Sequence, residues 1–255
     1  MRLFDTHAHY EDERFSSDRY ALIASLPEAG VEYVANVGCN VDGSRFAIGL
    51  AEKFNHVYAV IGIHPHDADE FSEEAIGEIE KLSRHEKVVA IGEIGLDYHY
   101  NFSPRDVQKN AFRCQMELAE KLNLPVCIHN REAHEDCMNI IREYPNVTGV
   151  FHCYSGSLET AREIVKLGYM ISFTGVITFK NAKKFGPIIA SLPEDRIMIE
   201  TDCPYLAPEP FRGKRNSSLY VYRVAEEIGR IRNIAPEEAA KLTTENALRF
   251  YRIKG

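Results

Sequence analysis

Short apolar, β-branched segments alternate with amphipathic stretches eight times along this chain. Nearly continuous hydrophobicity is typical of strands in a parallel sheet that is buried on both faces. Alternation of strand and helix implies right-handed crossovers, and eight such units within 255 residues favour a closed (β/α)8 TIM barrel of the α/β class. An open doubly wound sheet is the alternative. The eight segments are RLFDTH (2–7), VEYVANVG (31–38), VYAVIGIHP (57–65), VVAIGEIGLD (88–97), PVCIHNR (125–131), TGVFHCY (148–154), GYMISFTG (168–175) and RIMIETDCP (196–204).

Nothing in the alternation divides the chain into separate units. Linkers, low-complexity tracts and charge runs are all missing from the sequence, so we expect a single domain over residues 1–255. The last part, at about 217–252, has apolar residues at helical spacing and predicts helices that close the barrel. Hydrophobic residues make up 45% of the chain and charged residues 27%, which is typical of a compact globular protein.

Hydropathy and cysteine content indicate in which cellular compartment the protein is expected. No run approaches the roughly 18 consecutive apolar residues that a membrane-spanning helix needs. The six cysteines are scattered without a C-x-x-C pair, in a chain too large to need disulfide staples. We therefore expect reduced thiols, a cytoplasmic location and no membrane span. No obligate protein partner is indicated.

The charge balance limits how the protein could bind a polyanion. The formal net charge is −8, so the protein as a whole carries no electrostatic footprint for coating nucleic acid. A nucleic-acid substrate would have to be held locally. The candidate basic segments are TFKNAKK (178–184) and FRGKR (211–215), although a solvated lysine-rich helix face is an equally good interpretation of the first.

Histidines and carboxylates fall at the carboxyl ends of the predicted strands, where a barrel places its chemistry. Side chains two apart on a strand point to the same face about 6.6 Å apart. His7 and His9 can therefore converge on one ion while Ala8 points away. A single histidine is usually a hydrogen-bonded or surface residue, but independent placement of this whole set at one rim is improbable. The set is His7, His9, His64, Glu93, His129, His152 and Asp202.

Imidazole and carboxylate groups together are ligands for zinc, manganese, iron or nickel. Six ligands exceed what one tetrahedral zinc takes, and a shared carboxylate can join two metals about 3.5 to 4 Å apart. Glu93, near the middle of the order, is the natural bridge. The sequence thus predicts two divalent ions. One would be held by His7, His9 and Asp202, and the other by His129 and His152.

Nine motifs spread over the whole chain form a specific pattern: DTHAH (5–9), GIHPH (62–66), GEIGLDY (92–98), PVCIHNR (125–131), FHCYSGS (151–157), ISFTG (171–175), ETDCPYLAP (200–208), RGKRN (212–216) and TTENALRF (243–250). With these motifs the chain resembles the TatD family of metal-dependent hydrolases, within the wider amidohydrolase-like barrels. The resemblance implies a barrel with a two-metal centre ligated at the same six positions. It also implies deoxyribonuclease activity, typically removal of nucleotides from the 3′ end of DNA with magnesium or another divalent ion.

The chain departs from this family's pattern in two places. Ser217-Ser218 follows Asn216 where the family usually has Glu-Pro, and Tyr10 stands where Leu is common. Because the first departure lies beside the RGKR segment, it puts the phosphate contacts expected there in question.

The residues suggest particular roles in hydrolysis. Asp202, a carboxylate beside the attacking water, is our candidate for both ligand and proton acceptor, with a ligand role alone as the alternative. His64 could donate to the phosphate, orient a ligand or simply cap its turn. Arg131, on the face of His129, is a plausible phosphate clamp because guanidinium presents a planar fork. Weaker substrate-binding candidates, which could equally just face water, are Arg212, Lys214 and Arg215.

The sequence is compatible with three functions. The first is a two-metal phosphodiesterase that acts on DNA 3′ ends, with single-stranded DNA as the expected substrate. The second is hydrolysis of a C–N or ester bond in a small molecule on the same metal pair, which the negative charge favours slightly. The third is a non-catalytic metal-binding protein, against which the presence of all six ligands argues.

Overall fold

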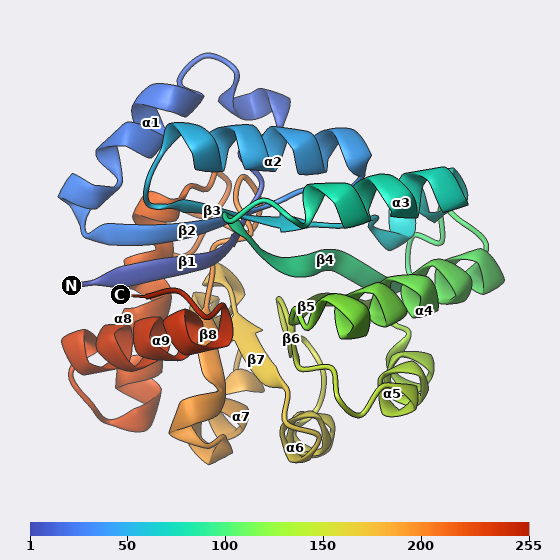
Figure 1. The fold of residues 1–255 in the computed structure, drawn as a ribbon. Helices are drawn as coiled ribbons and strands as arrows, with labels where there is room; N and C mark the ends of the chain where they lie inside the picture. The colour runs from blue at the N-terminus through green and yellow to red at the C-terminus, as the bar shows by residue number, and fades with distance from the viewer. Residues whose placement is uncertain (255) are drawn as a thin grey trace.

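The computed structural model describes residues 1–254. Its eight strands form one sheet in the order β1 to β8, and each strand pairs in parallel with the next one along the chain. Helices follow the strands and surround the sheet (Figure 1). The fold is a (β/α)8 TIM barrel, as the alternation predicts. The strands are β1 (Leu3–Ala8), β2 (Val31–Val37), β3 (Val57–Ile61), β4 (Val88–Asp97), β5 (Val126–Arg131), β6 (Gly149–Phe151), β7 (Met170–Phe173) and β8 (Ile197–Ile199).

The helices between the strands begin at polar caps in several cases. Asn40, for example, accepts a hydrogen bond from the Gly43 N–H at the start of α2. The α-helices are α1 (Arg19–Ser25), α2 (Val41–Lys53), α3 (Glu73–Leu82), α4 (Arg105–Leu122), α5 (His134–Glu143), α6 (Leu158–Lys166), α7 (Phe185–Ser191), α8 (Val221–Arg232) and α9 (Pro236–Phe250). Short 3-10 helices are η1 (Glu13–Phe15), η2 (Pro27–Ala29), η3 (Pro65–Glu70), η4 (Gly175–Thr178), η5 (Glu194–Arg196) and η6 (Ser218–Tyr220).

Two hydrophobic clusters hold the barrel together. The larger one lies between the strands and the surrounding helices, and the smaller one includes Phe4, Val60, Cys127 and Met198 from four different strands. Tyr251, which follows α9, belongs to the smaller cluster and donates a hydrogen bond to the Thr6 carbonyl at 2.9 Å. The closing helix is thereby tied to the first strand.

The ring of strands is joined between its first and last members at the carboxyl end. Ala8 forms a bridge with Cys203, which lies beyond the end of β8. The His9 N–H donates to the Cys203 carbonyl at 2.8 Å, and the Asp202 N–H donates to the His7 carbonyl at 2.9 Å. Because of these bonds, a residue near position 200 lies beside the histidines that end β1.

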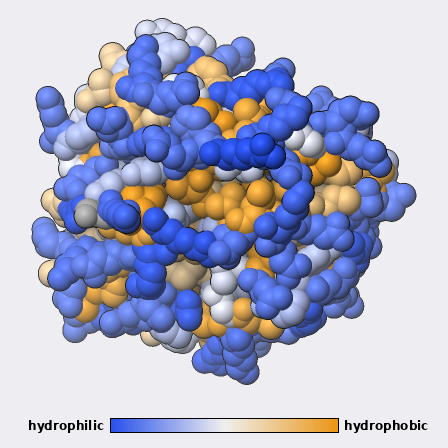
Figure 2. All heavy atoms as spheres, viewed as in Figure 1, coloured by the Kyte–Doolittle hydropathy of each residue, from blue (hydrophilic) through white to orange (hydrophobic). Residues whose placement is uncertain are grey.

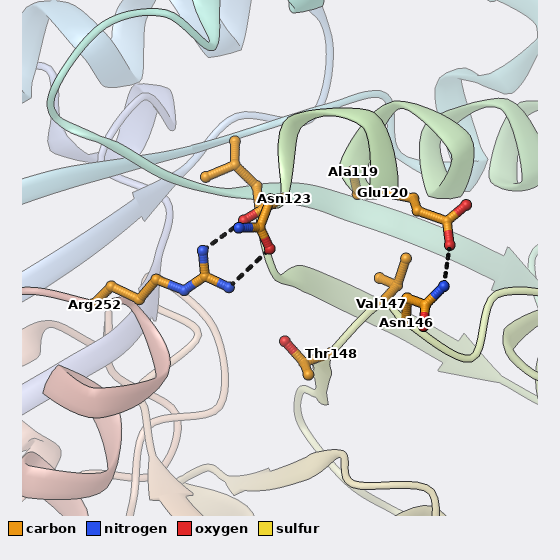
Figure 3. Close-up of a pocket in the computed structure, with 8 residues that line it drawn as sticks. Ala119, Glu120, Asn123, Asn146, Val147, Thr148 and Arg252 are labelled. Carbon is orange, nitrogen blue, oxygen red and sulfur yellow. Dashed lines mark hydrogen bonds between the residues drawn. The ribbon is translucent and has the colours of Figure 1, made fainter.

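A pocket at the opposite, amino-terminal end of β5 and β6 has no comparable chemistry. Arg252 donates to the Asn123 carbonyl there, at 2.6 Å, and Asn146 donates to Glu120 at 3.1 Å (Figure 3). None of the described residues that line this pocket belongs to a group able to hold a metal ion.

The outer surface carries mostly hydrophilic side chains, with smaller areas of hydrophobic atoms between them on the face shown in Figure 2. Among residues 1–254, no helix combines the length and apolarity needed to cross a lipid bilayer.

Candidate metal centre

The predicted site residues lie at the carboxyl end of the barrel, although not all of them end a strand. β4 continues to Asp97, so Glu93 lies four residues before its end, and β5 likewise continues past His129. His9 and His152 follow their strands directly, whereas His64 and Asp202 lie on the loops beyond β3 and β8. Although the strands differ in length, these side chains lie together at the carboxyl end of the barrel.

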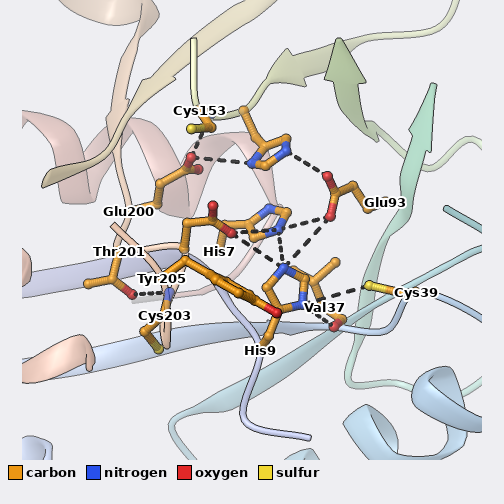
Figure 4. Close-up of polar contacts among 12 residues, drawn as sticks. His7, His9, Val37, Cys39, Glu93, Cys153, Glu200, Thr201, Cys203 and Tyr205 are labelled. Carbon is orange, nitrogen blue, oxygen red and sulfur yellow. Dashed lines mark hydrogen bonds and ion pairs between the residues drawn. The ribbon is translucent and has the colours of Figure 1, made fainter. Parts of the chain in front are cut away.

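Four atoms form a first group around one point. His7 Nε2 and His9 Nε2 lie 3.0 Å apart, and they lie 3.3 and 3.7 Å from Glu93 Oε2 (Figure 4). Asp202 Oδ1 lies 3.9 Å from His7 Nε2 and 3.4 Å from His9 Nε2. Ligands bound tetrahedrally at about 2.1 Å are about 3.4 Å from one another. The separations of this group therefore fit one divalent ion.

A second group surrounds the other oxygen of the same carboxylate. Glu93 Oε1 lies 2.6 Å from His152 Nε2 and 2.8 Å from His129 Nδ1. These two ring nitrogens are 3.5 Å apart, and His64 Nε2 lies 3.4 Å from Glu93 Oε1. The two oxygens of Glu93 thus face two different sets of imidazole nitrogens.

The far ring nitrogen of each histidine in these groups, His64 apart, faces an acceptor or a sulfur atom. His9 Nδ1 lies 3.1 Å from the Val37 carbonyl and 3.1 Å from Glu11. A proton fixed on the far nitrogen leaves a lone pair on the near nitrogen, which is the arrangement found in metal-ligating histidines. The other contacts are His129 Nε2 to Asp97 Oδ2 at 3.0 Å, His152 Nδ1 to Glu200 Oε1 at 3.4 Å and His7 Nδ1 to Cys127 Sγ at 3.4 Å.

His64 differs from the other histidines of the two groups in the ring nitrogen that carries its proton. Its Nδ1 accepts a hydrogen bond from the His66 N–H at 3.1 Å, where it caps η3. In the neutral ring the proton must then lie on Nε2, the nitrogen that faces Glu93. Burial lowers the pKa of His64 to about 4, so the ring is neutral at physiological pH. His64 therefore caps its turn and also presents a donor to the centre.

The electrostatics of the centre favour ionised carboxylates. Burial alone would raise the pKa of Glu93, but the surrounding histidines, His152 and His64 first among them, hold it well below its ordinary value. The pKa of Asp202 is also lowered, because its contact with His9 and the nearby imidazoles outweighs its burial. Cys39, which lies 3.9 Å from His9, has its pKa raised by burial to about 11 and remains a thiol.

The basic residues predicted to bind substrate differ in their surroundings. Arg131 is exposed at the end of β5, with its guanidinium 4.7 Å from the Tyr100 ring centre. Arg215 is engaged in an ion pair with Asp18 at 2.6 Å. Arg212 and Lys214 are exposed beside Phe179 and Phe211. Among the described residues, none of these four cations pairs with a carboxylate of the centre, so their role in substrate binding stays a prediction.

Sequence reasoning missed two residues that support the centre. Asp97 is fully buried, and its Oδ2 lies 2.9 Å from His66 Nε2 and 3.0 Å from His129 Nε2. The sequence spacing does indicate Asp97, because it follows Glu93 by four residues on one strand and so lies on the same face. His66 likewise follows His64 by two residues. Glu200, which contacts His152 and accepts a hydrogen bond from the Cys153 N–H, was also missed.

Replacing Asp97 with asparagine is expected to weaken metal binding about 10- to 100-fold, because the amide cannot hold the His129 ring as the carboxylate does. Titration of metal-free protein with zinc or manganese, followed by calorimetry, measures this loss. Asp42→Asn is the matched control, since the Asp42 side chain is 91% exposed on α2. Equal affinity in parent and Asp97→Asn protein would exclude this supporting role.

The two departures from the family pattern meet in one buried network. The Tyr10 hydroxyl donates to Ser218 Oγ at 2.8 Å, and Ser218 Oγ donates to Asp5 at 2.6 Å. Asp5 also accepts hydrogen bonds from the N–H and hydroxyl of Thr201 at 2.8 and 2.6 Å. The Ser218 side chain is therefore engaged in a buried network beneath the centre.

Ser218→Ala is expected to lower the free energy of unfolding by about 1–3 kcal/mol, because a buried acceptor loses a donor. Burial raises the pKa of Asp5 from 3.8 to about 6, so ionisation of this group destabilises the fold as pH rises through that range. Without the Ser218 donor the pKa rises further. The loss should therefore be larger at pH 7.5 than at pH 5, as measured by urea unfolding.

Ser25→Ala is the matched control for loss of a serine hydroxyl, because Ser25 is exposed. It should change the free energy of unfolding by less than about 0.5 kcal/mol. A Ser218→Ala protein with the parent's stability at both pH values would show that the network contributes nothing.

Comparison with known proteins shows the family of the chain. The sequence model of the TatD related DNase family matches residues 4–252. The chain belongs to the TatD family. It is 48% identical over 253 residues to the uncharacterized metal-dependent hydrolase YabD of Bacillus subtilis. The aligned region covers 98% of this chain and 99% of YabD. It is a metal-dependent hydrolase of this family, and the groups described above are its candidate metal ligands.

Other TatD-family proteins are similar along their whole length. The 3′-5′ ssDNA/RNA exonuclease TatD of Salmonella typhimurium is 31% identical, over 98% of this chain and 99% of that protein. The crystal structure of YJJV, a TatD homolog from Escherichia coli, has a TM-score of 0.93 and 30% identity, with 99% of each chain covered. The TatD-family barrel is therefore shared from end to end.

Proposed function

We propose that this TatD-family hydrolase is a divalent-metal-dependent phosphodiesterase that releases nucleotides from the 3′ ends of DNA. The observation that carries the proposal is the division of the two Glu93 oxygens between two groups of imidazole nitrogens. Support also comes from the similarity to a protein named as a 3′-5′ ssDNA/RNA exonuclease.

In this proposal Glu93 would supply one carboxylate oxygen to each of two ions. His7, His9 and Asp202 would hold one ion together with Glu93, and His129 and His152 would hold the other. When bound, the ions supply a water of lowered pKa and positive charge beside a phosphate oxygen. Nitrogen and carboxylate ligands suit zinc, manganese, nickel or iron, and magnesium fits through the carboxylates.

The side chains around the ions would move protons and position the substrate. Asp202 is ionised, with its side chain 15% exposed, and can accept a proton from the attacking water while it remains a ligand. His64 directs its Nε2 proton into the centre and can donate to a phosphate oxygen. Arg131, exposed on the rim, can pair with a second phosphate oxygen.

A second candidate is hydrolysis of a C–N or ester bond in a small molecule on the same ions. The net charge of −8 favours it, since a negative protein repels a polyanion. A non-catalytic metal-binding role is disfavoured, because all six ligand positions hold imidazoles or carboxylates that converge. A cytoplasmic location remains part of the proposal and is consistent with six free cysteines.

A substrate panel on metal-loaded protein tests the proposal. We expect metal-dependent release of nucleotides from 3′-labelled single-stranded DNA, with no release after treatment with a chelator. A 5′-labelled strand, an RNA strand, simple phosphodiesters, esters and amides complete the panel. Cleavage of amides or esters with all phosphodiesters intact would favour the second candidate. No metal-dependent hydrolysis of any substrate would leave only metal binding.

A further inference from the structure

Two exposed aromatic side chains stand on the loop between β4 and α4, at the carboxyl end of the barrel. Phe102 is 68% exposed and Tyr100 is 49% exposed. Their rings are stacked, with centres 5.4 Å apart and planes inclined by 21°. Two adjacent exposed rings form a contiguous apolar surface of the kind that marks a binding site. The pair is therefore a candidate surface for a ligand.

The pair is joined to the metal centre through one histidine. The His66 ring packs edge-to-face with the rings of Phe102 and Tyr100, at 4.9 and 5.4 Å between centres. His66 Nε2 shares the carboxylate of Asp97 with His129, whose other nitrogen faces Glu93. The rings thus lie two side chains away from a ligand of the centre.

Other exposed aromatic residues have a cation over their rings. Arg14 lies 4.2 Å from the Tyr205 ring centre, and Lys53 lies 4.0 Å from that of Tyr20. Arg131 lies over Tyr100 at 4.7 Å, whereas within residues 1–254 no guanidinium or ammonium group lies over Phe102. Phe102 is therefore the ring most available to a ligand.

The charges near the pair suit a nucleotide. Arg131 provides a positive charge beside Tyr100 and toward the rim. Two exposed acidic groups in this region are engaged by neighbours: Glu132 is paired with His99 Nδ1 at 2.9 Å, and Asp69 accepts a hydrogen bond from Ser103 Oγ at 3.3 Å. An aromatic face with an adjacent guanidinium can bind a flat base together with its phosphate.

We propose that Phe102, supported by Tyr100, stacks an unpaired nucleobase of a single-stranded substrate whose phosphodiester lies at the metal centre. The inference rests on the proposed function and specifies how that site selects its substrate. An unpaired base offers a free π-face to the ring, while a base inside a duplex is already covered by its neighbours. The pair thus favours single-stranded ends.

The test uses metal-loaded protein and 3′-labelled oligothymidylate. Phe102→Leu and Tyr100→Leu are expected to raise KM about tenfold with kcat within about twofold, and Phe102→Trp to retain the parent's KM. On the same oligonucleotide with abasic tetrahydrofuran residues in place of its last two nucleotides, parent and variants should have equal KM. Tyr20→Leu, a substitution of a 48% exposed tyrosine on α1, is the matched control and should leave both substrates unaffected.

An unchanged KM for oligothymidylate in both leucine variants would overturn the stacking proposal while the nuclease function stands. So would an equal rise in KM on the abasic substrate, which would indicate a structural role. If the parent cleaves no phosphodiester, the proposed function fails, and fluorescence anisotropy then decides. Weaker binding of labelled oligothymidylate by the leucine variants would support a base-stacking site, and equal binding would refute it.

Discussion

Glu93→Gln is expected to lower the rate of metal-dependent hydrolysis on the order of a thousandfold or more. The substitution keeps the shape of the side chain but removes the negative charge that both oxygens share between the two histidine groups. Metal ions contribute several kcal/mol to stabilisation of the transition state, and about 1.4 kcal/mol corresponds to a factor of ten in rate. Metal content, measured by mass spectrometry, should fall together with the rate.

The matched control is Glu245→Gln, because Glu245 is exposed on α9 and distant in sequence from the centre. It should keep the parent's rate and metal content. Circular dichroism and thermal unfolding show whether Glu93→Gln protein still folds. A folded Glu93→Gln protein with the parent's metal content and rate would refute the bridging role of this residue.

Asp202→Asn is expected to reduce kcat by about 10²- to 10⁴-fold, the usual contribution of a general base. The asparagine oxygen can still ligate an ion but cannot accept a proton at neutral pH. If Asp202 has both roles, the variant should retain part of its metal and lose most of its rate. Parallel measurement of kcat and metal stoichiometry separates these roles.

Two other outcomes have distinct meanings. Loss of metal and rate together, with activity restored by a high metal concentration, would indicate that Asp202 is a ligand only. An unchanged rate in a metal-loaded variant would contradict both roles. Asp136→Asn serves as a control, since Asp136 pairs with Lys109 at 2.7 Å on the outer helices.

The alternation of strand and helix segments, with polar residues toward the strand ends, explains why the fold and the residues near its rim could be predicted. His7 and His9 occupy alternate positions at the end of one strand, and their Nε2 atoms do lie 3.0 Å apart. The polar residues after β3, β6 and β8 follow apolar segments that the parallel barrel buries, so they meet at one rim. The predicted segment 88–97 has the same bounds as β4, but Glu93 lies four residues before the end of that strand.

Only the tertiary structure decided which groups pair, because pairing depends on strand register and rotamers that no short sequence window contains. It placed Asp97 between His66 and His129, and it engaged Arg215 with Asp18. It also brought Tyr10 and Ser218, 208 positions apart, into one hydrogen bond beneath the centre. By itself the sequence determined the barrel, through its eight alternating strand and helix segments, and the side chains that can reach the rim, through their positions toward the carboxyl ends of those strands. Which atom of each side chain faces which partner required the closed barrel, whose first strand and the segment after its last join through Ala8 and Cys203.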